Sequence, residues 1–196
     1  MKSQESYAWK AKRFCVLAIG LSLVLSGCSV AKRYMATDTA FENRIEYNTR
    51  DTRVYNDLKT VAIGSALLID KRFADGYLEL YKTRVQPTDE QFQKVKTRLY
   101  GYLDKTTFLI NFYSPEAAFS NLDGNSKWQI SFSVDGKKLY PIEIKESKPE
   151  DWSYLSDINR WDRRYIVRFD TTKVRGVVTV SSILGELRFD FRNFRR

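Results

Sequence analysis

The most regular feature of the chain is an alternation of apolar and polar positions that begins near residue 106. Apolar residues occupy every second position in 108–112 and again in 128–134, which is the spacing of a β-strand that buries one face. Further short apolar segments lie at 139–144, 165–169, 174–182 and 187–191. The second half of the chain is therefore predicted to form a run of strands.

Turn residues separate these predicted strands. The dipeptide Asp135-Gly136 is a strong signal for a tight turn between two strands, and Gly185 indicates a hairpin between the last two. Pro141 has no backbone N–H to donate, so we expect its strand to lie at a sheet edge or to carry a bulge.

Residues 53–69 show a different pattern, with apolar residues on both faces. Ile63 and Leu67 fall on one face, and Ala62 and Ala66 fall on the other. This pattern predicts a single strand that is buried on both sides.

Two helices are predicted after this strand, near 71–84 and 88–104. Asp70 is suited to be an N-cap residue, and apolar residues follow it at helical spacing. Thr88 and Gln91 have the spacing of a capping box. The chain is thus expected to insert a helical pair after its first strand.

These elements favour a mainly β fold with inserted helices. We expect an immunoglobulin-like antiparallel β-sandwich of about seven strands, with a small β-barrel as the alternative. Two facing sheets would bury the apolar faces of the strands without a full covering of helices. We assign this domain to residues 52–196.

The N-terminal part has the pattern of a secretory leader. A basic segment at 2–13 precedes an apolar run at 15–25. Eleven residues span about 16 Å as a helix, which is too short for the roughly 30 Å hydrocarbon core of a bilayer. The run ends at Leu25-Ser26-Gly27-Cys28.

This tetrapeptide resembles the lipobox of bacterial lipoproteins, and the resemblance covers residues 1–29. It implies that a signal peptide, 1–27, is cleaved between Gly27 and Cys28, and that Cys28 carries acyl chains such as palmitate. Several chains give durable membrane anchoring. The implied location is the cell envelope, and Ser29, in place of an Asp, is compatible with the outer membrane of a Gram-negative host.

Residues 28–51 are predicted to be the lipidated Cys and a tether. Residues 29–51 are polar and mixed in charge, and their only periodicity is a weak helical signal around Phe41 and Ile45. Because Cys15 is removed with the leader and Cys28 is lipidated, we expect the domain to fold without a disulfide.

Composition narrows the chemistry that is open to the protein. The 196 residues carry a net charge of +9 and include no His. Nucleophile systems that rely on His and the common zinc sites are therefore excluded. We expect no catalytic residue, no cofactor and no metal site. The carboxylates of the C-terminal part each lie near a base in sequence, which favours solvated ion pairs over a catalytic pair. They are Glu150, Asp151, Asp157, Asp162 and Asp170.

Aromatic and basic residues gather in the segment 152–164. Its three large aromatic residues are interpreted in two ways, either as caps on the open end of the sandwich or as part of a candidate partner surface. That surface would comprise Trp152, Tyr154, Trp161, Arg163 and Arg164.

The sequence thus favours a membrane-anchored, non-enzymatic interaction or envelope-assembly module. Its expected partners are the membrane, through the anchor, and an envelope protein or an anionic envelope polymer; no nucleic acid is expected for an exported protein. The alternative is a small-ligand or lipid-binding lipoprotein that uses a cavity between sandwich and helices. An enzyme that acts on envelope polymers through paired carboxylates comes third.

Overall fold

A computed structural model describes residues 39–152, 155 and 163–194. Residues 41–196 belong to one compact unit, and the strands of the described residues lie within it. Residues 39–48 are helical and are called the N-terminal helix below. The elements that follow are β1 (Thr49–Asn56), β2 (Lys59–Leu68), α2 (Lys71–Val85), α3 (Asp89–Tyr100), β3 (Thr106–Tyr113), the 3₁₀ turn η1 (Ala117–Phe119), β4 (Gln129–Val134), β5 (Lys137–Leu139), β6 (Pro141–Glu146), the 3₁₀ turn η2 (Pro149–Trp152), β7 (Arg163–Phe169), β8 (Val177–Ser182) and β9 (Gly185–Asp190).

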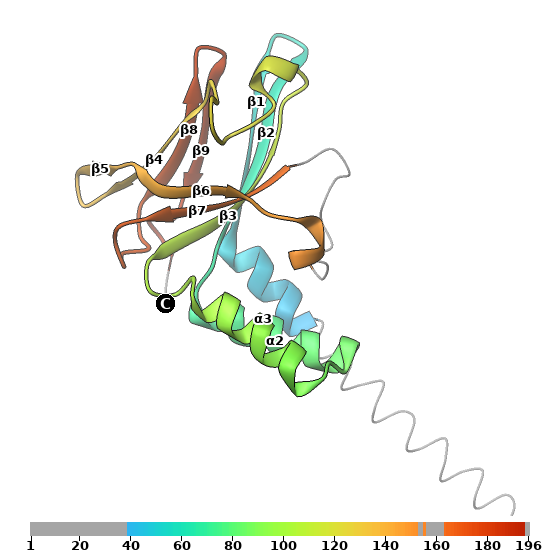
Figure 1. The fold of residues 1–196 in the computed structure, drawn as a ribbon. Coiled ribbons are helices and arrows are strands. Elements are labelled where there is room, and N and C mark those ends of the chain that lie inside the picture. The colour runs from blue at the N-terminus through green and yellow to red at the C-terminus, as the bar shows by residue number, and fades with distance from the viewer. Residues whose placement is uncertain (1–38, 153–154, 156–162, 195–196) are drawn as a thin grey trace, which may run out of the picture. The chain divides into compact units, whose positions relative to one another are not determined.

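Two antiparallel sheets contain the nine strands of the described residues. One sheet has the order β1-β2-β3-β7-β6 and the other the order β5-β4-β8-β9 (Figure 1). The prediction of a mainly β fold with a few helices is confirmed. Pro141 lies in β6, which is an edge strand with an irregular register between Pro141 and Glu143, so both expectations for this residue are confirmed.

The expected count of about seven strands is too low, because two predicted strands are each divided. The segment 53–69 turns at Asp57 and Leu58 to form the β1–β2 hairpin. The strand predicted after Gly136 passes from one sheet to the other at Tyr140, which separates β5 from β6. The helical pair consequently follows the second strand and not the first.

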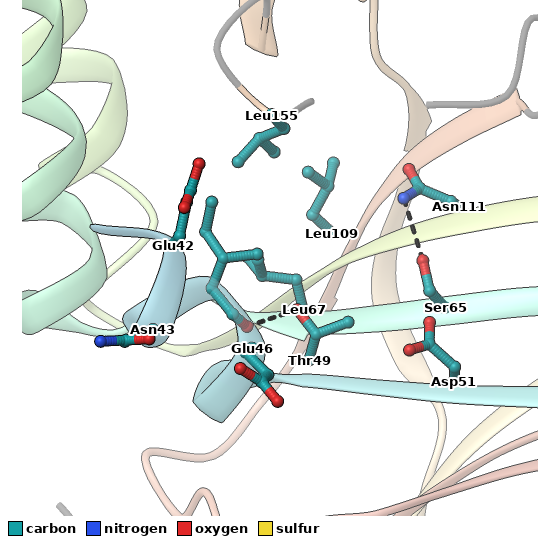
Figure 2. A pocket seen from close by; sticks show the side chains of 11 residues that line it. Glu42, Asn43, Glu46, Thr49, Asp51, Ser65, Leu67, Leu109, Asn111 and Leu155 are labelled. Atoms are coloured by element: carbon teal, nitrogen blue, oxygen red, sulfur yellow. Dashed lines mark hydrogen bonds between the residues drawn. The ribbon is translucent and has the colours of Figure 1, made fainter. Parts of the chain in front are cut away.

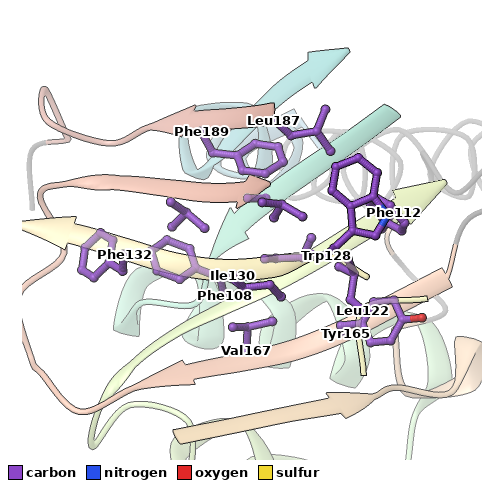
Figure 3. Close-up of a cluster of buried hydrophobic side chains, with 14 of the residues drawn as sticks. Phe108, Phe112, Leu122, Trp128, Ile130, Phe132, Tyr165, Val167, Leu187 and Phe189 are labelled. Carbon is purple, nitrogen blue, oxygen red and sulfur yellow. The ribbon is translucent and has the colours of Figure 1, made fainter. Parts of the chain in front are cut away.

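The larger core lies between the two sheets (Figure 3). Aromatic rings from both sheets meet there, including Phe108 and Phe132, whose ring centroids are 5.5 Å apart. Gly64 lets the sheets approach closely, because a Cβ at this position would come within 3.1 Å of the Phe189 ring and 3.2 Å of Leu187. Burial of these apolar side chains between facing sheets is the main stabilising term for this part of the fold.

A second core lies on the other face of the five-stranded sheet. Leu67, Leu109 and Ile166 come from three adjacent strands of that sheet, and helical residues such as Phe73 and Leu99 pack against them. The second half of β2 therefore packs on both faces, as the pattern of 53–69 predicts, whereas β1 has no buried residue. The fold has three layers, which are the helices, the five-stranded sheet and the four-stranded sheet.

The helices begin where the sequence predicts. The Asp70 side chain accepts a hydrogen bond from Phe73 N at 2.8 Å and caps α2. Thr88 and Gln91 form the reciprocal bonds of a capping box at the start of α3. Local signals therefore determine both helix starts.

The predicted tether is wrong for residues 39–51. Residues 39–48 are helical and Thr49 starts β1. Phe41 is buried, and its ring lies 5.8 Å from that of Phe73 in α2. The N-terminal helix buries only a narrow stripe of its surface and so needs few apolar residues. This explains why the helical periodicity of its sequence is weak. The rest of the predicted tether lies outside the described residues.

Candidate binding cavity

A row of polar residues crosses the outer face of the five-stranded sheet, beside the apolar row that the helices cover. Strand register aligns Asp51 with Ser65, Ser65 with Asn111 and Asn111 with Arg164. In a β-sheet, residues opposite each other on adjacent strands share a face. The adjoining apolar row is Leu67, Leu109 and Ile166.

The N-terminal helix and this part of the sheet enclose a cavity of about 500 Å³ (Figure 2). Its floor contains Leu67 and Leu109 together with the polar pair Ser65 and Asn111. The cavity is lined by Glu42, Asn43, Ile45, Glu46, Thr49, Asp51, Ser65, Leu67, Leu109, Asn111 and Leu155. Apolar and polar groups thus share one concave surface, as in many small-molecule sites.

Hydrogen bonds hold the cavity's walls in place. Asn111 Nδ2 donates to Ser65 Oγ at 2.9 Å, which links β3 to β2 across the floor. Thr49 Oγ1 donates to the carbonyl oxygen of Ile45 at 2.6 Å, which fixes the end of the N-terminal helix to β1. Asn48 Nδ2 is within 3.0 Å of Leu68 O and of Asp70 Oδ1. The helix therefore has a fixed position above the sheet.

The side-chain oxygen of Asn111 is the notable group in the floor. It is buried and has no hydrogen-bond partner within the described residues. Leaving a buried acceptor without a donor costs about 1–3 kcal/mol. A ligand that carries an N–H or O–H donor would remove this cost.

The charge of the cavity is opposite to that of the chain. Glu42, Glu46 and Asp51 line it, and no Lys or Arg is among the lining residues within the described part of the chain. The whole chain carries +9. A concave site with one sign of charge concentrates ligands of the other sign, so this site favours cations.

The residues predicted to form a partner surface are not together on the surface. Trp152 is fully buried among the helices, and its Nε1 donates to Ser147 Oγ at 2.8 Å. Arg164 is only 3% exposed and donates to Trp152 O at 3.2 Å. Of the three members that the structure describes, only Arg163 is exposed, with its Nε 4.0 Å from Glu146. The predicted partner surface is therefore wrong for Trp152 and Arg164, because a buried ring and a buried guanidinium cannot contact a partner.

Other predicted site residues lie outside the described part of the structure. They are Gly27, Cys28, Tyr154, Trp161, Asp157 and Asp162.

Carboxylates of the C-terminal part that the structure does describe pair with bases. Asp170 lies 2.7 Å from Lys105 Nζ, and this hydrogen bond holds the pKa of Asp170 below its ordinary value. Asp151 pairs with Arg98. Such pairs agree with the interpretation as solvated ion pairs.

Sequence reasoning offered a cavity between sandwich and helices as an alternative but identified none of the residues that line it. The available signals were Ser65 and Asn111, each a polar residue within an apolar strand. Neither signal shows that the two residues are opposite each other in adjacent strands, because register is a property of the folded sheet.

Comparison with known proteins leaves the function open. No protein-family model matches the chain, and no curated protein matches it. A crystal structure described as that of a novel protein of unknown function from Burkholderia pseudomallei K96243 is similar over 85% of this chain and 90% of its own, with 14% identity and a TM-score of 0.42. This similarity is too low to support a functional argument.

Two further observations concern the described ranges alone. No helix in them is long and apolar enough to cross a membrane. No three acidic or Cys side chains in them come together as they would around a metal ion.

Proposed function

We propose that this protein is a lipid-anchored, non-enzymatic binding protein of the bacterial cell envelope, and that the cavity beneath the N-terminal helix holds its ligand. The observation that supports the proposal is the cavity itself, in which three carboxylates surround a floor that is partly apolar. This combination fits a small amphipathic molecule with a cationic group. Among the functions expected from the sequence, it favours the small-ligand alternative.

The two parts of such a ligand match two parts of the cavity. Its apolar part would lie on Leu67 and Leu109, which belong to the rigid sheet. Its ammonium group would lie near Glu42 and Glu46, and a separate N–H or O–H group could donate to the Asn111 side-chain oxygen. Contacts made by ionised groups are stronger than those between neutral groups, so the cation would determine the specificity.

The anchor and the location belong to the same proposal. Support comes from Leu25-Ser26-Gly27-Cys28 at the end of an apolar run. Three further expectations rest on the sequence alone and are proposals. They are a location in the outer membrane, an envelope protein or anionic polymer as a further partner, and an immunoglobulin-like strand topology. Residues 148–196 contain eleven Lys or Arg and seven Asp or Glu. This basic segment supports the polymer, whereas the acidic cavity would repel it.

The cavity can be tested with a matched pair of small probes. Benzylammonium and benzoate have similar shapes and opposite charges, and saturation-transfer NMR detects binding in the millimolar range. We expect benzylammonium to bind and benzoate to fail. Binding should weaken as the salt concentration rises, because ions screen exposed charges.

Substitution of the helix carboxylates shows whether the probe occupies this cavity. Glu42→Gln with Glu46→Gln removes two charges and should weaken benzylammonium binding about tenfold. Glu79→Gln is the matched control, because Glu79 is exposed on α2 and does not line the cavity. The proposal would be contradicted if both probes bound equally well, or if Glu79→Gln weakened benzylammonium binding as much as the double substitution does.

A further inference from the structure

Two β-hairpins present fully exposed aliphatic side chains at their turns. Leu58, in the β1–β2 turn, is 100% exposed, and Ile183, in the β8–β9 turn, is 92% exposed. Tyr55, close to the first turn, is 54% exposed. One exposed aliphatic residue is ordinary, but a group of them on one surface indicates a contact site.

The two hairpins lie side by side although they belong to different sheets. A Cβ on Gly185 would come within 2.7 Å of Val54 Cγ1, so the start of β9 touches β1. Figure 1 shows both turns at the same end of the sandwich. The two exposed side chains therefore belong to one surface.

A groove of about 660 Å³ lies on this surface. Its apolar lining comes from both hairpins and from β3, and includes Val61, Ile63, Tyr113 and Leu184. Ile183 forms part of its wall, and Leu58 lies in the turn next to it. The surface thus carries both projecting aliphatic side chains and a groove that could receive them.

The groove also carries one charge of each sign. Lys59 and Glu116 both line it and both are exposed. Neither belongs to the ion pairs found among the described residues. A surface with opposite charges at two places can be complementary to a copy of itself.

We propose that this surface is a two-fold interface between two copies of the chain. In a two-fold interface the same patch meets itself, so residue i of one copy contacts residue j of the other and the reverse. Leu58 of each copy would enter the groove of the other, and Lys59 of each would pair with Glu116 of the other. The proposal does not depend on the ligand cavity, because the groove and the cavity share no lining residue.

The mixed charge favours a second copy over a lipid surface, because an anionic membrane would attract Lys59 and repel Glu116. The patch is small, so the dimer should be weak. Confinement on a membrane would raise the effective concentration of the protein and increase the dimer fraction.

The oligomeric state tests the proposal. Sedimentation equilibrium of the full chain in a density-matched detergent should show reversible dimerisation. Leu58→Asp and Ile183→Asp should each weaken it at least tenfold. Ile142→Asp is the matched control, since Ile142 is a 54% exposed aliphatic residue on β6, and it should leave the dimer unchanged.

A charge exchange distinguishes this interface from any other. Lys59→Glu alone places two Glu residues opposite each other at both contacts, and Glu116→Lys alone does the same with two Lys residues. Each variant should be monomeric, whereas an equimolar mixture should form heterodimers in which every contact joins opposite charges.

Three outcomes would overturn the proposal. They are a monomer at every concentration, a dimer that Leu58→Asp leaves intact, and a mixture of the two charge variants that stays monomeric. A monomer whose Leu58→Asp variant loses only its affinity for lipid vesicles would assign the surface to a membrane instead.

Discussion

Gly176 lies where the segment before β8 passes against β4. A Cβ at this position would clash with the carbonyl oxygen of Ser133 and would come within 2.6 Å of the Phe132 ring. Both neighbours are fixed, because Ser133 O is backbone and the Phe132 ring is fully buried in the core between the sheets (Figure 3). The site has no space for a side chain.

We therefore expect Gly176→Ala to lower the free energy of unfolding by about 1–3 kcal/mol, the usual cost of overpacking. Urea denaturation monitored by circular dichroism measures it. Gly124→Asn is the control: φ is +55° there, Asn tolerates that conformation, and no atom lies within 4 Å of the added Cβ. A loss in the control as large as that in Gly176→Ala would contradict the packing argument.

At the residue scale, residue type placed Arg164 on a surface and left two positions open for Trp152, a buried cap or a surface residue. Trp152 and Arg164 looked suited to a partner surface, but both are buried. An Arg among apolar neighbours can be buried when a backbone carbonyl accepts its hydrogen bond, as Trp152 O does for Arg164. That acceptor is remote from Arg164 in sequence, so residue type alone could not reveal the burial.

The Asp70 side chain connects two helices. Its side chain caps α2 through Phe73 N and accepts from Asn48 Nδ2 at the end of the N-terminal helix. Asn48 is only 2% exposed and also donates to Leu68 O in β2. One carboxylate thus helps to place the helix that covers the cavity.

Removal of this carboxylate should destabilise the helical layer. Asp70→Ala removes the N-cap and one hydrogen bond of the buried Asn48 amide. We expect it to lower the free energy of unfolding by about 1–2 kcal/mol. Asp70→Asn retains an acceptor oxygen and should cost much less. The check is chemical denaturation of both variants beside the wild-type protein; equal losses would show that the cap is not the cause.

Among the elements, those with a signal in their own residues were predictable. The capping box at Thr88, the turn at Asp135-Gly136 and the hairpin at Gly185 all occur in the structure. The turn at Asp57-Leu58 was missed because its second residue is apolar and extends the pattern of the strand. Asp57 has φ of +54°, and this turn chemistry was the signal that could have revealed it.

For the whole molecule, the five-stranded sheet is the central layer. It contributes one face to the core between the sheets and the other to the core beneath the helices. The helices leave the polar row of the outer face partly exposed, and this incomplete cover creates the cavity. The candidate site thus follows from the way in which the layers fit together.

Attachment to the membrane is the proposal that concerns the whole protein. Cys28→Ala should abolish incorporation of radiolabelled palmitate in cells and release the protein from the membrane fraction. Cys15→Ala is the control and should change neither, because Cys15 lies inside the predicted leader. Labelling that persists in Cys28→Ala would refute the lipid anchor.

The sequence by itself determined the mainly β class, the two helices α2 and α3 with their start residues, and the burial of β2 on both of its faces. These properties depend on residues that are close together in the chain. Only the tertiary structure decided the cavity, the buried positions of Trp152 and Arg164, and the contact between the two hairpins. Each depends on strand register or on packing between layers, which bring together residues far apart in sequence.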